Sequence, residues 1–158
     1  MTGVVLVDYD FAVLRVVPRV HTGAFVNVGV VMHARTTEFL ALRSVSGVDR
    51  LRVVAPGLDA ELLERYLRSC AAICAGDSAA GPVALAPPSE RFHWLTAPRS
   101  DVLQSSPVHE GVCVDPAAEL DVLFSSYVIE PVTPDPPASS IVSAAGLQRS
   151  PVTRTGAE

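Results

Sequence analysis

The chain has 158 residues, of which 49% are hydrophobic and 18% are charged, and its formal net charge is −5. This composition indicates a folded globular protein, because disordered chains combine low hydrophobicity with high net charge. All twelve basic residues are arginines, which excludes the lysine chemistry of P-loops and Schiff bases. No apolar run reaches the roughly 18–20 residues that a membrane helix requires. Asp8 and Asp10 replace the positive charge of an export signal, so we expect a cytoplasmic protein.

Three strands are predicted in the N-terminal third of the chain. Residues 9–18 and 25–34 are rich in valine, and the first run ends at Pro18, which cannot extend a hydrogen-bonded ladder. Residues 38–45 form a third run after a tight turn. Because short connections join successive strands, we expect an antiparallel three-stranded meander.

Helices are predicted in the rest of the domain. Residues 60–75 carry apolar side chains at helical spacing, with Asp59 as the N-cap and Gly76 just beyond the end. Residues 90–96 form a short helix, and residues 116–128 form another that begins at a proline. Shorter segments complete the domain: a helical turn at 48–54, a loop at 77–88, and strands at 102–104 and 112–114.

We therefore expect the α+β class, with an antiparallel β-meander sheet covered on one face by helices. Residues 1–129 form this single domain. From residue 130 the chain is rich in proline, serine and threonine and has no aromatic residue. Such a segment buries too little apolar surface to offset its ordering entropy. We expect residues 130–158 to be a disordered tail that is dispensable for folding.

Alternation along the second strand divides its residues into two sets. The expected core face holds Val26, Val28, Val30 and Met32, and the other face holds Asn27, Gly29 and His33. The amide of Asn27 either satisfies a neighbouring backbone group or contacts a ligand. If the hairpin pairs Arg15 with Gly29, then Arg15 joins Asn27 on its face, whereas a slip of one residue separates them. The six-residue connection leaves both registers open.

Polar side chains gather between residues 91 and 109. Arg99 has the fork of donors that holds phosphate or carboxylate, and His109 carries an imidazole, a side-chain type that can move a proton. With Ser100, which adjoins Arg99, and with Arg15 and Asn27, these residues are the candidate anion- or ligand-binding set. The alternative is that Arg99 and Ser100 hold a loop in place by bonding to its backbone.

The anion hypothesis requires these residues to converge. If residues 102–104 form a strand, Arg99 precedes it and His109 lies beyond its far end, so the chain must fold back at residues 105–107. Proline at position 107 favours such a bend. We therefore expect the Arg99 guanidinium to share an anion with either His109 or Arg15.

The residue pattern supports little other chemistry. Cys70 and Cys74 lie four apart on a predicted helix among apolar neighbours, so we interpret them as buried hydrophobic residues rather than metal ligands. Asp8 and Asp10 face one way, but two acids without a third are interpreted as solvated groups. The GxSxG, HExxH, GxGxxG and CxxC motifs are absent from the sequence, and we assign no catalytic residue, metal or cofactor.

Several runs match a single family pattern. They are residues 9–18 (YDFAVLRVVP), 25–31 (FVNVGVV), 56–59 (PGLD), 91–95 (RFHWL), 97–100 (APRS) and 106–109 (SPVH). Together they resemble the bacterial family called domain of unknown function 3037, over about residues 9–128. The resemblance implies a protein with no established activity or cofactor. It also implies a small companion, encoded beside proteins similar to the HipA-type kinases of toxin–antitoxin systems.

We therefore expect an accessory or interaction module that works with a separately encoded protein partner. The alternative is an enzyme or binding protein that acts on a phosphorylated or nucleotide-like small molecule through Arg99 and His109. The first requires an exposed apolar patch or a free strand edge, and the second requires a concave pocket that holds both residues. We expect no membrane partner, and the acidic balance disfavours nucleic acid. Phe92 and Trp94 are accordingly expected to be buried anchors rather than a base-stacking platform.

Overall fold

A computed structural model describes residues 3–19, 22–99 and 101–128. The strands are β1 (Val7–Val16), β2 (Val26–Ala34), β3 (Phe39–Ser44), β4 (Leu103–Ser105) and β5 (His109–Cys113). The helices are α1 (Ala60–Ala75), α2 (Pro88–Thr96) and α3 (Pro116–Tyr127), with short 3₁₀ turns at Arg35–Thr37, Val48–Val53, Ser78–Ala80 and Pro82–Leu85. The expected α+β class is confirmed. The predicted tail at 130–158 lies outside the described residues. No helix among the described residues has the length and apolar character needed to cross a membrane.

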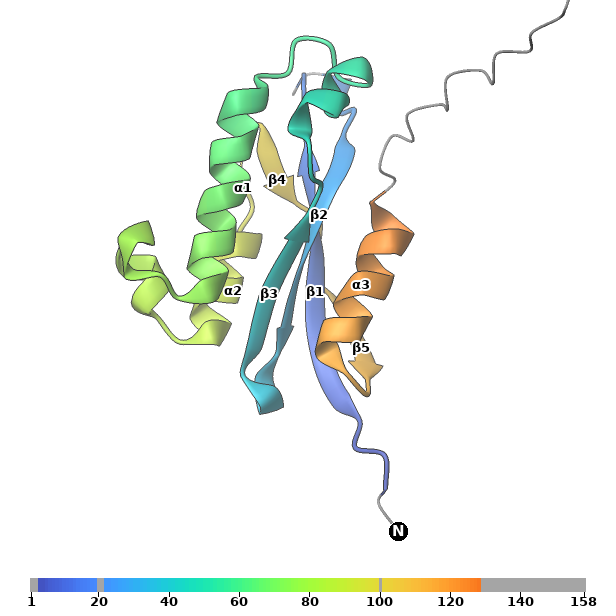
Figure 1. The fold of residues 1–158 in the computed structure, drawn as a ribbon, viewed down its shortest axis with the longest axis vertical. Coiled ribbons are helices and arrows are strands. Elements are labelled where there is room, and N and C mark those ends of the chain that lie inside the picture. The colour runs from blue at the N-terminus through green and yellow to red at the C-terminus, as the bar shows by residue number, and fades with distance from the viewer. Residues whose placement is uncertain (1–2, 20–21, 100, 129–158) are drawn as a thin grey trace, which may run out of the picture.

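The sheet is antiparallel and has the order β3-β2-β1-β4, with β5 also paired to β1 (Figure 1). The predicted meander is therefore confirmed. β4 and β5 lie one after the other along the same edge of β1, joined at Ser106. There the Ser106 backbone N–H donates to the Val13 carbonyl (2.8 Å), and the Val13 N–H donates to the Ser106 hydroxyl (2.9 Å). The chain thus stays beside β1 through Pro107, and the bend expected at residues 105–107 does not form.

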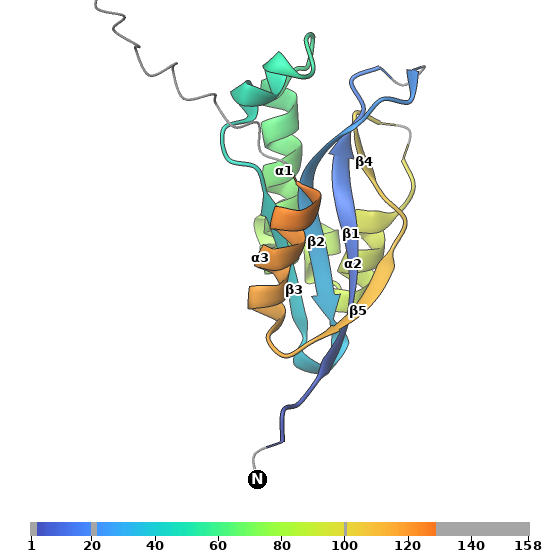
Figure 2. The same cartoon turned by 90° about the vertical axis from the view of Figure 1, so that its right-hand side faces the viewer.

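Helices cover both faces of the sheet, not one face as expected. α1 and α2 pack on one face, against β3 and β2, and α3 packs on the other, against β2 and β3 (Figure 2). The central strand β2 is consequently buried on both sides from Val28 to Ala34. A strand covered on both faces does not alternate between apolar and polar side chains, which explains the continuous valine run.

A β-bulge in β2 corrects the predicted division of its residues. Leu14 pairs with Gly29 but Arg15 pairs with Asn27, so Val28 is an extra residue on β2. The extra residue reverses the alternation. Asn27 therefore faces α3, where its Nδ2 donates to the Tyr127 carbonyl (2.8 Å). Gly29 lies on the opposite face.

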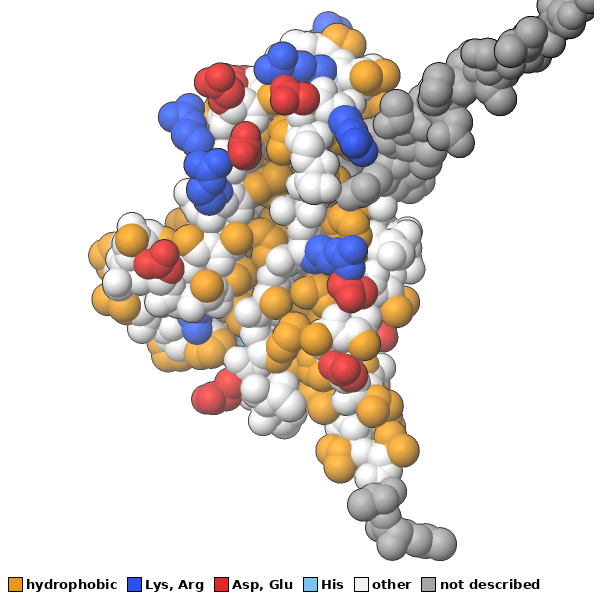
Figure 3. Space-filling view, viewed as in Figure 1, with side chains coloured by type: hydrophobic (Ala, Val, Ile, Leu, Met, Phe, Trp, Pro, Cys, Tyr) orange, Lys and Arg blue, Asp and Glu red, His pale blue; other side chains and the backbone are white. Residues whose placement is uncertain are grey.

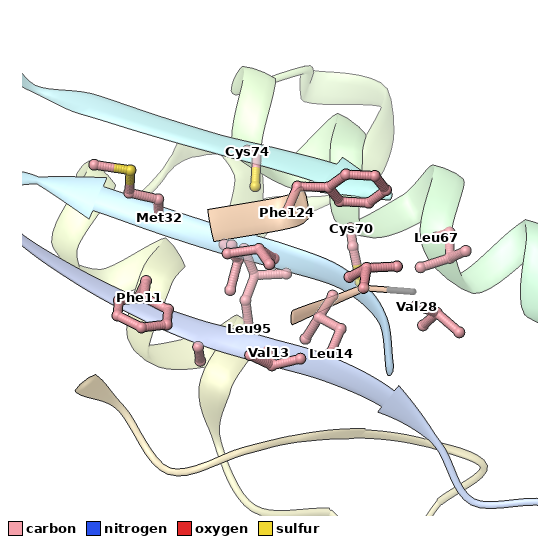
Figure 4. Packing of buried hydrophobic residues seen from close by; sticks show 14 of the residues in the cluster. Phe11, Val13, Leu14, Val28, Met32, Leu67, Cys70, Cys74, Leu95 and Phe124 are labelled. Carbon is pink, nitrogen blue, oxygen red and sulfur yellow. The ribbon is translucent and has the colours of Figure 1, made fainter. Parts of the chain in front are cut away.

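The core forms where the side chains of β1 and β2 meet the three helices (Figure 4). α1 begins and ends as predicted: the Asp59 carboxylate accepts from the Leu62 N–H (3.0 Å), and Gly76 takes a left-handed conformation with φ of 71°. Phe92 is buried, as expected. Trp94 is 40% exposed, so its expected role as a buried anchor is wrong. It lines a cavity with Cys70 of α1 and Leu103 of β4.

Candidate functional site

Arg99 is held at the end of α2. Its Nη2 donates to the Trp94 carbonyl (2.7 Å), and its guanidinium lies over the Trp94 ring, 4.0 Å from the centroid. The carbonyl belongs to the last turn of α2, where helix C=O groups need outside donors. Arg99 also lines a cavity of about 310 Å³ with Cys70 and Asp101. Ser100 lies outside the described residues.

His109 lies far from Arg99, on the other face of the sheet. It pairs with Phe11 in the sheet, and the two rings lie 5.3 Å apart between centroids. Leu103, four residues after Arg99, pairs with Val16. The five positions between Phe11 and Val16 span roughly 16 Å of strand. Because the chain does not bend back, the structure does not bring Arg99 and His109 together.

Arg15 and Asn27 do come together, directly opposite each other on β1 and β2. The Arg15 guanidinium lies over the ring of Phe25, 4.5 Å from its centroid, and the Asn27 amide bonds to the end of α3. Arg15 lines a small surface cavity of about 250 Å³ with Phe25 and Gln104, whereas Asn27 is not part of its lining. Neither His109 nor Arg99 lines this cavity. The predicted set thus divides into separate places.

Arg91 is a structural residue that sequence reasoning placed in the polar cluster. Its Nη1 donates to the carbonyls of Ile73 and Cys74, both at 2.8 Å, at the C-terminal end of α1. It therefore supplies the donors that the last turn of a helix lacks. Cys74 and Cys70 are buried free thiols, and burial raises the pKa of Cys74 to about 12. They are not activated nucleophiles.

The two faces of the sheet differ at the N-terminal end of β1. On one side α3 buries Val7 and Tyr9, and the Tyr9 hydroxyl donates to Glu119 of α3 (2.8 Å). On the other side α1 and α2 do not reach this end, and Asp8 and Val112 are exposed. We call this uncovered region the bare face. It consists of Asp8 and Asp10 of β1 with Glu110 and Val112 of β5.

Exposed apolar side chains continue from the bare face along the chain. The N-terminal stem that precedes β1 carries Val4, Val5 and Leu6, which are 72%, 75% and 65% exposed. Val112 and Val114 at the adjoining edge are 54% and 61% exposed. The stem projects below the body of the molecule, with hydrophobic side chains gathered along it (Figure 3). Clustered exposed apolar side chains of this kind indicate a binding surface.

His33 borders the bare face from below α2. It pairs with Asp10 on β1, and its ring stacks on Phe92 of α2 with 5.5 Å between centroids. The side chain is only 4% exposed, yet it makes no hydrogen bond within the described part of the chain. Burial lowers the pKa of His33, and the cations of Arg35 and Arg91 add to this effect, while Asp10 opposes it. The imidazole is therefore neutral at pH 7.

A cavity of about 670 Å³ joins these groups. His33 forms part of its wall, Arg35 lies at the turn beside it, and three carboxylates approach it from the strands: Asp8, Asp10 and Glu110. Sequence reasoning noted two of these acids but found no third. The third, Glu110, lies 100 residues away and reaches Asp10 only because β5 pairs with β1. No local sequence signal marks it.

The fold and these surfaces define a small α+β protein with a twice-covered central strand and an uncovered sheet end. A family model described as a protein of unknown function (DUF3037) matches residues 11–128. The chain belongs to this family. No significant match to a curated protein or to a solved structure was found.

Proposed function

We propose that this protein is an interaction module, and that the bare face and N-terminal stem bind an extended segment of a separately encoded cytoplasmic protein. The observation that carries the proposal is the asymmetry of the sheet. One face is covered to its end by α3, whereas the other leaves apolar and acidic side chains uncovered at the same end.

The chemistry of the partner segment follows from that surface. Among the described residues β5 pairs only with β1, so its other edge offers unpaired backbone groups to which a strand can add by β-augmentation. Apolar side chains on the added segment would pack against the exposed Val4, Leu6 and Val112. Basic residues on that segment would be attracted to the three carboxylates of the cavity. HipA-like kinases, which the family resemblance implies as neighbours, are the first partner class to test.

The alternative function, with Arg99 and His109 acting together on a phosphorylated substrate, has no supporting geometry. Arg99 bonds to the end of α2, and His109 packs on the opposite face against Phe11.

The test is site-specific photo-crosslinking in the native host. A benzophenone amino acid replaces Val112 on the bare face or, as a matched control, Val53, which is 81% exposed on a 3₁₀ turn elsewhere. We expect one discrete crosslinked protein from position 112 and none from position 53. That protein, once purified, should bind the unmodified chain and fail to bind Leu6→Asp, while Val53→Asp retains binding. Equal crosslinking from both positions, or unchanged binding by Leu6→Asp, contradicts the proposal.

A further inference from the structure

The cavity at the bare face is lined by carboxylates that form no ion pair among the described residues. Within residues 3–19, 22–99 and 101–128, the ion pairs join Arg43 to Asp121, Arg52 to Asp49, and Arg68 to Glu64. None of them includes the three cavity carboxylates. Against the single cation Arg35, these acids leave the lining with a net charge of about −2 when His33 is neutral.

The buried imidazole of His33 is the second, independent feature of this cavity. It is 96% buried, as its 4% exposure states, lies in the cavity wall, and has no hydrogen-bond partner among the described residues. Its ring nitrogens are not sealed from the cavity, because Arg91 Nε is the side-chain atom that is fully buried without a partner among the described residues. A neutral imidazole has one nitrogen that accepts a hydrogen bond. The cavity therefore offers one buried acceptor and three carboxylates, all of which suit a ligand with several donors.

The spread of these acceptors determines which cation fits. Among the described residues, no group of three or more His, Cys, Asp or Glu side chains is arranged to hold a metal ion. The carboxylates are instead distributed along two strands. Asp10 lies opposite Glu110, and Asp8 precedes Asp10 by two residues on β1. A guanidinium group has five N–H donors in a planar fork and bonds to several separated oxygens at once. A lysine ammonium is a compact point charge with three donors.

We propose that this cavity receives the guanidinium group of an arginine side chain, held between Asp10 and Glu110 with one N–H donated to the ring of His33. The inference rests on the proposed function, because the arginine belongs to the partner segment that lies along the bare face. Its neighbours in that segment are apolar, since Leu6, Val112 and Val114 flank the acids. The volume of about 670 Å³ accommodates an arginine side chain together with part of its backbone.

Short peptides test the chemistry without knowledge of the partner. The probes are acetyl-Val-Arg-Val-amide, the same peptide with citrulline, which has the shape of arginine without its charge, and acetyl-arginine-amide. Binding is followed by NMR titration of the full chain, including the His33 ring signals. We expect the arginine peptide to bind at least tenfold more tightly than the citrulline peptide. It should also bind more tightly than acetyl-arginine-amide, because the latter lacks the apolar flanks; equal binding of those two would assign the cavity to a free guanidino compound and overturn the partner segment as the source.

Charge-removing variants locate the site. Asp10→Asn combined with Glu110→Gln keeps the shape of both side chains and should weaken binding of the arginine peptide at least tenfold. Asp49→Asn removes an exposed acid on another part of the surface and should leave binding unchanged. Equal binding of the arginine and citrulline peptides by the unmodified chain overturns the inference without any variant. Equal losses in the double variant and in Asp49→Asn overturn it as well.

The two proposals fail in different ways. A partner crosslinked from position 112, together with no preference for arginine over citrulline, overturns the arginine pocket and leaves the interaction module intact. A clear arginine preference, with no protein crosslinked from position 112, overturns the interaction module as stated.

Discussion

The α3 face and the bare face of this sheet are formed by alternate residues of the same strand, β1. The first is covered by a helix and the second is exposed to solvent. On the α3 face, Tyr9, Phe11 and Met32 are buried beneath one helix. On the bare face, alternate residues of the same strand, Asp8 and Asp10, lie beside open solvent. The apolar packing of the first face is explained by folding stability alone.

Stability does not explain the bare face. Valine and leucine side chains that stay exposed to solvent add no folding free energy, because they bury no apolar surface. Acids without an ion-pair partner on neighbouring strands repel one another. A surface with both features is consistent with binding to something apolar and cationic. The contrast therefore separates residues that maintain the fold from residues that are free to serve a function, and the following experiments test that separation.

The largest expected difference is between Phe11 and Leu6. Phe11→Ala removes a buried ring that contacts Tyr127 and Tyr9, with centroids at 5.5 and 6.0 Å, and should lower the free energy of unfolding by about 3–5 kcal/mol. Leu6→Asp alters an exposed stem residue and should change it by less than about 0.5 kcal/mol. Urea denaturation measures both. A loss of several kcal/mol in Leu6→Asp would mean that the stem packs against the body, and the contrast between the faces would be lost.

The next effect concerns the α3 face at Gly111. A Cβ built on Gly111 would lie 2.4 Å from the Tyr9 ring, which crosses β5 to reach Glu119. Gly111→Ala should therefore cost about 1–3 kcal/mol, through displacement of the ring and loss of its hydrogen bond. The same substitution in a Tyr9→Ala background should cost much less, and denaturation of the unmodified chain and the three variants would measure this difference as a coupling energy. Additive costs would show that the ring does not cover this glycine.

His33 makes the border of the bare face sensitive to pH. Its pKa is lowered in the folded protein, so the unfolded chain binds the proton more readily and stability falls as pH drops through the unfolded value near 6.5. The charged groups that act on it are Asp10, Arg35, Arg91 and His93. We expect a slope of at most about 1.4 kcal/mol per pH unit between pH 7 and 5.

The control for this pH dependence is a pair of histidine variants. His33→Gln should remove the slope, and His93→Gln, which alters an exposed histidine of α2, should retain it. Thermal denaturation across the pH range measures both. An unchanged slope in His33→Gln would assign the pH dependence to other groups.

The smallest expected effect distinguishes an arginine that stabilises the fold, Arg99, from one that forms no ion pair, Arg35. Arg99→Ala loses the bond to the Trp94 carbonyl and the stacking on the Trp94 ring, and should cost about 1 kcal/mol. Arg35→Ala, beside the bare face, forms no ion pair within the described residues and should be neutral in stability. If Arg99→Ala leaves stability unchanged but abolishes phosphate binding, Arg99 is a ligand residue and not a structural one.

The elements were largely predictable because their signals are local. Capping by Asp59 and Gly76 defines α1, and Asp115 caps α3 by accepting from the Ala117 N–H (3.0 Å). The bulge at Val28 had no such signal, since any residue of a valine-rich strand can be the extra one. That single residue moved Asn27 to the α3 face, away from Gly29.

The sequence by itself determined the class of fold, the three-stranded meander, the main helices and the family. The fold class, the meander and the helices follow from residue periodicity and from capping, which act over a few neighbouring positions. The family was indicated by the resemblance of short runs such as residues 91–95 (RFHWL) and 106–109 (SPVH). Only the tertiary structure decided that helices cover both faces, that β4 and β5 run along β1, and that Glu110 meets Asp10 beside His33. These contacts join residues more than 100 positions apart, such as Val7 and Cys113. Which strand pairs with which depends on the packing of the whole core. The candidate site lies at the end of the sheet that α1 and α2 do not cover.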